Sequence, residues 1–370
     1  MAPYLARLAM GASSRGPMDQ LSAHLDRGWD LVGRGDLAGA ALSARKCLEL
    51  DEGSAEAHHL LGYVRAAEGH AEEALEHYRR AIDLDESFVE AMLDAAGLIV
   101  DRGGDPREAL RLVDDALEWI EDEPERADAL LLKVEAYLRA GDVDAARRTL
   151  ALLPDEPFDV AELEFLRGRA YAEIGDTERA ERHLRRAIEL VPDHAEAHHE
   201  LGHLLERTGR EAEARLEFLR TQRADAIAPA PAWAPSREDF EGTVAVAIGH
   251  LPPELRAALD GTLVVVTDVP GAEVVADGVD PRVPVLIDAA AEPAEPPRAG
   301  RLFVYQRNVE RMAGGPDRLE ATTVEAIENE LGAVFPSLEP IVQSRRAARE
   351  SFERGGQEGS GSTSAGPGDD

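Results

Sequence analysis

The amino-acid sequence predicts a mostly α-helical protein: a right-handed α-solenoid of six helix-turn-helix repeats in residues 18–223, then a small α+β domain in residues 237–340. Two observations predict this organisation. Small and apolar residues recur about every 34 residues through residues 21–222, and the composition changes after Arg223. A period of this length is typical of helical pairs that stack on their neighbours, because one pair cannot bury its apolar face alone.

Three small-residue positions define each repeat. One position near the middle of the first helix lets the second helix approach closely, and it holds Gly28, Gly62, Ala96, Val134, Gly168 and Gly202. A second position supplies the positive φ that ends the first helix, and it holds Gly35, Gly69, Gly103, Gly141, Gly175 and Gly209. Five or six residues later, an alanine opens the packing face of the second helix: Ala40, Ala74, Ala109, Ala146, Ala180 and Ala214. Extra residues near Glu121–Pro124 lengthen the interval between Gly103 and Gly141.

These positions resemble the tetratricopeptide repeat (TPR) family over residues 21–222. The resemblance implies a curved array whose first helices line the concave side and hold a peptide segment. The groove residues that it implies are Leu25, Trp29, His59, Tyr63, Leu93, Leu131, Leu138, Phe165, Arg169, His199 and His203. The alternative for each is packing within the array.

The charge of the chain limits the classes of partner. With 40 Lys+Arg against 73 Asp+Glu the formal net charge is −33, which disfavours nucleic acid and anionic membranes. We therefore expect a protein or peptide partner that is basic or neutral; the oligomeric state stays open. The single cysteine, Cys47, excludes an intramolecular disulfide and fits a cytoplasmic location.

Residues 199–203 read His-Glu-Leu-Gly-His, which matches the H-E-x-x-H motif of zinc peptidases. On a helix the two imidazoles lie one turn apart, with Glu200 beside them as a general base. However, Leu201 and Gly202 are already the expected Leu-Gly pair of the sixth repeat. We therefore expect no catalytic residue and no cofactor here. The alternatives left open are an active zinc metallopeptidase that uses His199, Glu200 and His203, and adventitious metal binding by these histidines with Glu206 or His194.

The region after the repeats begins with a Pro/Ala-rich linker, residues 224–236, whose Trp233 is expected to dock on a neighbouring surface. Apolar periodicity then predicts a helix near 240–248, and Pro253 starts another turn. β-Branched runs predict a buried strand at 262–267, a weaker strand at 283–287 and a third at 301–306; a last helix follows at 319–335. We expect residues 1–17 to form a disordered leader or to precede the true start at Met18, and the tail, residues 341–370, to be disordered from about residue 355.

This order of elements resembles a small bacterial family of minimal zincin-like metallopeptidases over residues 237–340. The family's H-E-x-x-H motif falls on Asn329-Glu330-Leu331-Gly332-Ala333, so Glu330 and the Leu-Gly pair match while both zinc-binding histidines are missing. An asparagine amide is a poor zinc ligand and alanine is none. The resemblance therefore implies a pseudoenzyme with no metal site, in which Glu330 is a vestige of the catalytic glutamate.

Together these observations predict a non-enzymatic scaffold that binds a peptide in the repeat groove and carries a peptidase-like domain without zinc ligands. A third interpretation is that the second domain only caps the apolar end of the array.

Overall fold

The computed structural model describes residues 17–289 and 297–360, and divides them into two compact units. The first unit contains the chain up to Ala234 together with two short excursions, Gly271–Pro281 and Gly314–Asp317. The second unit contains the remaining segments from Pro235 onward. The expected leader falls almost entirely on residues 1–16, outside the described residues.

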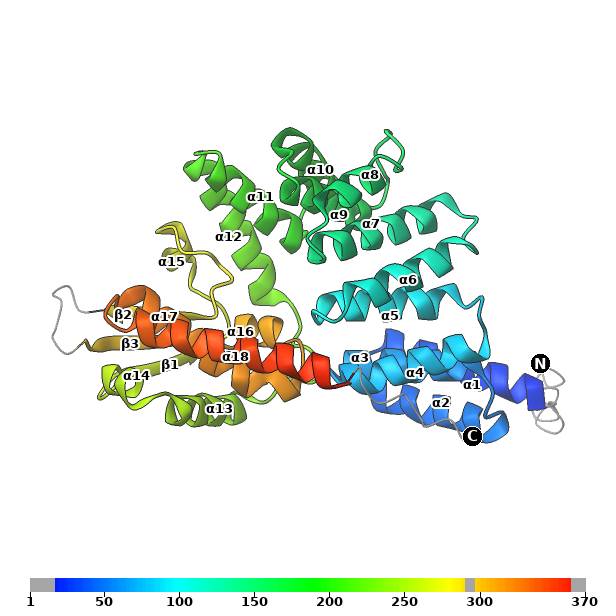
Figure 1. The fold of residues 1–370 in the computed structure, drawn as a ribbon, viewed down its shortest axis with the longest axis horizontal. Coiled ribbons are helices and arrows are strands. Elements are labelled where there is room, and N and C mark those ends of the chain that lie inside the picture. Colours follow the sequence, from blue (N-terminus) through cyan, green and yellow to red (C-terminus); the bar gives the residue numbers. More distant parts are fainter. Residues whose placement is uncertain (1–16, 290–296, 361–370) are drawn as a thin grey trace, which may run out of the picture. The chain divides into compact units, whose positions relative to one another are not determined.

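Twelve helices form the repeat array of the first unit and stack in chain order (Figure 1). The first helices of the six pairs are α1 (Pro17–Gly33), α3 (Ala55–Ala67), α5 (Val89–Asp101), α7 (Glu123–Arg139), α9 (Ala161–Glu173) and α11 (Ala195–Arg207). Their partners are α2 (Leu37–Leu50), α4 (Ala71–Leu84), α6 (Pro106–Leu117), α8 (Val143–Leu150), α10 (Thr177–Leu190) and α12 (Glu211–Ile227). The predicted solenoid is confirmed.

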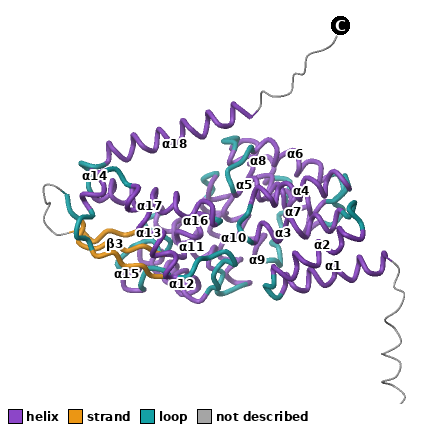
Figure 2. Tube along the Cα trace, turned by 90° about the horizontal axis from the view of Figure 1, so that it is seen from below, coloured by secondary structure: helices purple, strands orange, loops and turns teal. Residues whose placement is uncertain are grey.

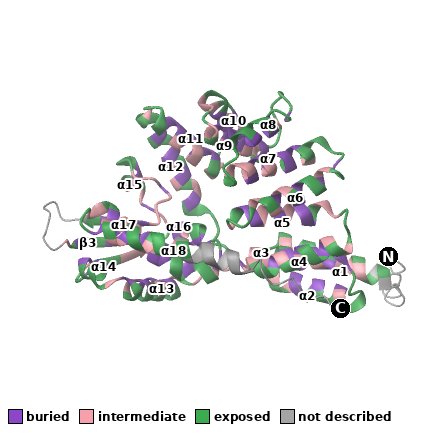
Figure 3. Cartoon of the chain, in the orientation of Figure 1, coloured by how far each residue is buried: buried purple, intermediate pink, exposed green. Residues whose placement is uncertain are grey.

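The second, fifth and sixth helical pairs close through a glycine contact, as the sequence predicts. A Cβ added to Gly62 would lie 2.6 Å from the ring of Tyr78, and one added to Gly202 would lie 2.4 Å from the ring of Phe218. All six glycines that were expected to end the first helices have a positive φ, between 68° and 83°. Buried faces therefore meet within the pairs and exposed faces point outward (Figure 3).

A polar pair crosses between the two helices in three of the repeats, always 19 residues apart. Glu164 Oε2 lies 2.7 Å from His183 Nδ1 in the fifth repeat, and Glu217 Oε2 lies 2.6 Å from His198 Nδ1 in the sixth, with acid and base exchanged. In the second repeat the same positions hold His58 and His77, whose Nδ1 atoms are 3.2 Å apart. Glu164 is completely buried, so the imidazole is essential to satisfy its charge.

The excursion Gly271–Pro281 belongs to the core of the array although it interrupts the chain of the second unit. Its short helix α15 (Ala272–Ala276) packs on α12, and fully buried Val275 joins the hydrophobic cluster that contains Leu201 and Phe218. The sequence did not predict this element, because five residues carry no readable periodicity. The excursion covers the last helix of the array. One interpretation of the sequence is that the whole second domain caps the array, and this excursion fills that capping role.

The excursion Gly314–Asp317 lies against the turns of the second and third repeats. Arg102 Nη2 donates to the carbonyl oxygens of Gly314, at 2.5 Å, and Gly69, at 3.3 Å. A Cβ on Gly69 would meet Pro316 at 2.6 Å and Trp233 at 3.2 Å. Trp233 therefore docks as predicted. The first residues of the expected linker are helical instead, because α12 continues to Ile227.

The second unit is built on a three-stranded sheet in the order β1-β3-β2; Figure 2 draws its strands in orange. Strand β1 (Leu263–Thr267) pairs parallel with β3 (Ala299–Tyr305), and β2 (Val285–Ala289) pairs antiparallel with β3; Val265 faces Phe303 in the first pair and Leu286 faces Phe303 in the second. The expectation that 262–267 is a buried strand is wrong, since β1 is an edge strand whose Leu263 and Val264 are 60% and 38% exposed.

Helix α17 (Leu319–Val334) lies at the centre of the second unit and contacts α13 (Arg237–His250), α16 (Gln306–Ala313), α18 (Glu339–Ser360) and β2. The remaining helix of this unit is α14 (Pro253–Ala258); the 3-10 turn Pro316–Arg318 begins in the excursion Gly314–Asp317 of the first unit. Arg345 and Arg349 of α18 both pair with fully buried Glu328 of α17. This pairing fixes the start of a helix that runs to Ser360, beyond the point where the composition predicted disorder. Residues 361–370 lie outside the described part.

We predict that Gly62→Ala lowers the free energy of unfolding by about 1–3 kcal/mol, because the new methyl group overlaps the Tyr78 ring. Gly97→Ala is the matched control: Gly97 lies within α5 with open space around it, so the same change is neutral or adds up to about 1 kcal/mol through helix propensity. Urea unfolding followed by circular dichroism measures both. Equal effects would show that the close approach at Gly62 does not matter.

We also predict that the two buried Glu–His pairs make the array acid-sensitive. Burial raises the pKa of Glu164 and of Glu217, but hydrogen bonds from His183 and His198 and neighbouring arginines lower both below the ordinary value. A carboxyl group whose pKa is lower in the folded state stabilises the fold above about pH 4.3, and this contribution is lost as the pH falls through the folded pKa.

The unfolding free energy should therefore fall as the pH is lowered from about 5 toward 3, and fall less in Glu164→Gln/Glu217→Gln. Glu86→Gln, at an exposed turn position, should keep the wild-type dependence. An unchanged pH profile in the double variant would contradict the assignment.

Candidate functional site

Successive first helices contact each other along the array, α1 with α3, α3 with α5, α5 with α7, α7 with α9, and α9 with α11. This close inner layer makes them the concave side of the solenoid. The residues that lie ten and six positions before each turn glycine fall on this face, and they include most of the predicted groove residues.

The aromatic end of this face is formed by α1 and α3. Trp29 contacts His59 and Tyr63, with ring centroids 5.4 Å apart in both cases. Trp29 and Tyr63 are 36% and 39% exposed, so a partner can reach both rings. His59 is buried and its Nε2 lies 2.8 Å from Asp94 Oδ2 on α5, which joins the aromatic end to the next repeat.

The other predicted groove residues divide between core and surface. Leu131 and Phe165 are buried in the array, and Leu25, Leu93 and Leu138 are half-buried against it, so these five are packing residues first. Arg169 is accessible; its Nη2 donates to Glu135 Oε2 at 2.6 Å, and its guanidinium stacks over Phe165. Glu135 occupies the repeat position of Tyr63 and Arg169, and the prediction from sequence missed it by naming Leu138 instead.

Acidic side chains dominate the rest of the inner face. Asp128 is exposed, yet its surroundings on this face raise its pKa, first through desolvation and then through the charges of Glu162 and Asp94. Desolvation likewise raises the pKa values of Asp101 and Glu173. Arg169 and Arg139 oppose both rises, while Glu135 adds to both and Glu200 adds to that of Glu173. Like charges from successive repeats therefore crowd one accessible surface, which we call the acidic face: Asp94, Asp101, Asp128, Glu135, Glu162, Glu173 and Glu200.

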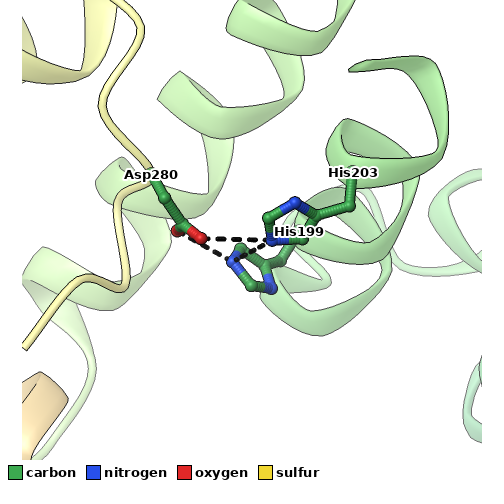
Figure 4. Close-up of side chains that lie close together, drawn as sticks. All are labelled: His199, His203 and Asp280. Atoms are coloured by element: carbon green, nitrogen blue, oxygen red, sulfur yellow. Dashed lines mark hydrogen bonds and ion pairs between the residues drawn. The ribbon is translucent and has the colours of Figure 1, made fainter. Parts of the chain in front are cut away.

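A second cluster forms where α11 meets the excursion Gly271–Pro281, all within the first unit. His199 and His203 lie one turn apart on α11 and point toward Asp280 (Figure 4). Asp280 Oδ1 lies 3.0 Å from His199 Nε2, and Oδ2 lies 3.1 Å from His203 Nε2. The hydrogen bond with Asp280 is the main reason why the pKa of His203 is raised; burial opposes it.

The sequence indicated both histidines but not their partner, since Glu206 or His194 was the expected further ligand. The Glu206 carboxylate instead lies 3.7 Å from Nδ1 of His203, the nitrogen that does not face Asp280, and His194 accepts the backbone N–H of Ala197 and caps α11. Asp280 is distant in sequence and lies in a segment without a motif, so no pattern could have indicated it.

Within the described residues, the degenerate motif on α17 holds no metal-binding cluster, and only His199, His203 and Asp280 bring three potential ligands together. Asn329 Oδ1 instead accepts from Arg346, and Ala333 is exposed. Glu330 Oε1 accepts the backbone N–H of Ile287 on edge strand β2 at 3.0 Å; burial raises the pKa of Glu330, and this hydrogen bond opposes the rise.

Comparisons with known proteins place TPR units on the array. Three tetratricopeptide repeat models match residues 55–88, 102–168 and 165–229. These segments are therefore tetratricopeptide repeats, which indicate a protein–protein interaction scaffold. No curated protein matches the chain.

Solved structures that resemble the chain include three TPR-like proteins. They are pilF from Pseudomonas aeruginosa (18% identity, 62% of this chain and 99% of that one, TM-score 0.47), the type IV pilus biogenesis factor PilW (16%, 56% and 94%, 0.48), and the TPR protein TTC0263 from Thermus thermophilus (19%, 53% and 99%, 0.40). The repeat assignment rests on the family models and on the geometry above. No helix in the described residues is both long and apolar enough to cross a membrane.

We predict that the role of Glu330 is to accept the hydrogen bond of the Ile287 backbone N–H on edge strand β2. Glu330→Ala leaves the Ile287 N–H without its partner and should lower the free energy of unfolding by about 1–3 kcal/mol. Glu330→Gln keeps an acceptor oxygen and removes a carboxylate whose raised pKa disfavours the fold at neutral pH, so it should be neutral or stabilising. Chemical denaturation at pH 7 distinguishes the two variants. Equal losses would show that the negative charge itself is needed.

Proposed function

We propose that the protein is a non-enzymatic scaffold whose concave face binds a basic, extended peptide segment of a partner protein. The acidic face is the observation that carries this proposal. The pKa values of Asp101, Asp128 and Glu173 are raised first by desolvation and then by neighbouring carboxylates, and a cationic partner placed between such carboxylates stabilises their charged forms. Lysine and arginine side chains supply that charge.

The aromatic end gives such a peptide a place to anchor. Trp29 and Tyr63 present accessible rings, and a lysine or arginine over a ring face gains cation–π attraction of about 0.5–1 kcal/mol at an exposed site. A peptide that places one side chain there would extend past Asp94 and Asp128 along the acidic face. The formal charge of −33 supports the same preference and disfavours polyanionic partners such as nucleic acid and anionic membranes.

We propose, as a separate and finer inference, that residues 237–340, apart from the excursions Gly271–Pro281 and Gly314–Asp317, form a zincin-like domain that has lost its zinc ligands and serves as a binding module. Helix α17 runs beside edge strand β2 and carries Glu330 at the place of a catalytic glutamate, and this arrangement supports the proposal. Asn329 and Ala333 replace both histidines, which favours binding without peptide cleavage over the alternative of a zinc metallopeptidase. The single, buried cysteine supports a cytoplasmic location.

Peptide binding to the full chain tests the main proposal. The probes are fluorescein-labelled 12-residue peptides of matched length, one rich in lysine and leucine, one rich in serine and leucine, and one rich in glutamate and leucine. Fluorescence anisotropy should detect the basic peptide alone, with an affinity that falls as salt is raised. Asp94→Asn/Asp128→Asn should weaken binding of the basic peptide at least fivefold. Adding Tyr63→Ala to this double variant should weaken the binding further.

The control is Asp83→Asn/Asp144→Asn, which removes the same charge from exposed positions on the second helices α4 and α8. It should leave the affinity within twofold of wild type. If both double variants weaken binding equally, the peptide senses net charge rather than the acidic face, and the proposal fails. Binding of all three peptides with equal affinity would also refute it.

A further inference from the structure

The cluster of His199, His203 and Asp280 brings two imidazoles and one carboxylate to one place. The Nε2 atoms of the two histidines are 3.2 Å apart, and each also lies within 3.1 Å of a carboxylate oxygen of Asp280. If both Nε2 atoms carry protons, each donates to its own Asp280 oxygen, and no lone pair remains for a hydrogen bond between the two rings. If one Nε2 atom accepts from the other instead, its lone pair faces the carboxylate.

A metal ion satisfies all three side chains at once, because both imidazole nitrogens and a carboxylate oxygen can then present lone pairs to one centre. Zinc takes imidazole nitrogen and carboxylate oxygen at about 2.0–2.2 Å in tetrahedral geometry, which separates neighbouring ligand atoms by roughly 3.3–3.5 Å. The two Nε2 atoms, 3.2 Å apart, are already close to that spacing, and one ligand atom from each of the three residues lies within 4.8 Å of the other two.

We propose that His199, His203 and Asp280 form a binding site for a divalent transition-metal ion, zinc above all, that fastens the excursion Gly271–Pro281 to helix α11. The ligand set of two imidazoles and one carboxylate selects zinc and its late first-row neighbours over calcium and magnesium, which prefer oxygen ligands. The site does not depend on the peptide-binding function proposed above.

The surroundings of the two imidazoles support this assignment. The ring of Phe218 contacts His203 edge-on at 5.1 Å between centroids and lies 6.0 Å from His199, so it restricts both imidazole orientations. The Glu206 carboxylate is 3.7 Å from His203 Nδ1, on the side of the ring opposite the metal-facing nitrogen. Carboxylates at that position orient metal-binding histidines and increase their basicity.

The metal would act as a second anchor for the excursion. Val275 already inserts into the hydrophobic core of the array. Asp280 lies five positions further along, just before the excursion ends at Pro281. A bond from Asp280 through the ion to α11 fixes this second end. Bound zinc should therefore protect residues 272–281 from hydrogen exchange.

Zinc binding to the full chain tests the proposal. Protein stripped with EDTA is titrated with zinc chloride against a chromophoric chelator, and with cobalt chloride, whose absorption bands report the ligand field. We expect one zinc ion per wild-type chain. His203→Ala should abolish this binding, and Asp280→Asn, which preserves the shape of the side chain, should weaken it at least tenfold and change the cobalt spectrum.

The matched control is His77→Ala. His58 and His77 also hold their facing nitrogens 3.2 Å apart, but no carboxylate joins them in a three-ligand cluster within the described residues. This variant should bind zinc like wild type. Circular dichroism and melting in EDTA confirm that all variants are folded, so a loss of binding reports on ligands rather than on structure.

Three results would overturn the inference. Wild-type protein could fail to bind zinc stoichiometrically, or Asp280→Asn could bind as tightly as wild type, which would leave only a histidine pair on one helix. Alternatively, zinc could bind without slowing hydrogen exchange in residues 272–281, which would refute the anchoring role.

Discussion

The close approach of two helices within each repeat is the constraint on which the rest of the array depends. An added Cβ would lie only 2.6 Å from the Tyr78 ring at Gly62 and 2.4 Å from the Phe218 ring at Gly202, so any side chain at these two positions would push the second helix away. Because the pairs close tightly, the first helices of neighbouring repeats also meet, and their outward positions form one continuous face. Crowded carboxylates on that face follow directly from this packing.

The polar pairs between the helices show how a repeat tolerates charge in its interior. The same two positions hold Glu164 and His183 in the fifth repeat and His198 and Glu217 in the sixth, so the order of acid and base is free while their complementarity is kept. Each pair satisfies a buried group that would otherwise cost several kcal/mol. In the fifth and sixth repeats the pair also makes the two helices specific for each other, since a helix that carries the glutamate requires a histidine on the helix opposite it.

The sequence predicted the features that recur in every repeat. It did not predict the contacts made by segments that lie outside the repeat pattern. Six glycines with positive φ, six helical pairs and the positions of Trp29, Tyr63 and Arg169 all follow from a periodic pattern that one chain displays several times. The strands of the second unit were found through β-branched runs, but the exposure of Leu263 depends on strand order, which short strands do not reveal. Asp280 and Val275 were beyond prediction for a similar reason: their partners are distant in the chain, and neither belongs to a pattern.

The two excursions also determine when the array can be completed during synthesis. Residues 18–223 hold every repeat, yet Val275 fills the core beneath the last helix, and Gly314 supplies an oxygen that Arg102 binds. A ribosome that has released the sixth repeat has therefore not yet released the residues that finish it. The last helix of the array stays uncovered until most of the second unit has been synthesised. For the same reason, dividing the chain at any one position cannot give two fragments that each contain a complete unit. The segments of the two units alternate along one chain, so neither unit is a continuous stretch of sequence.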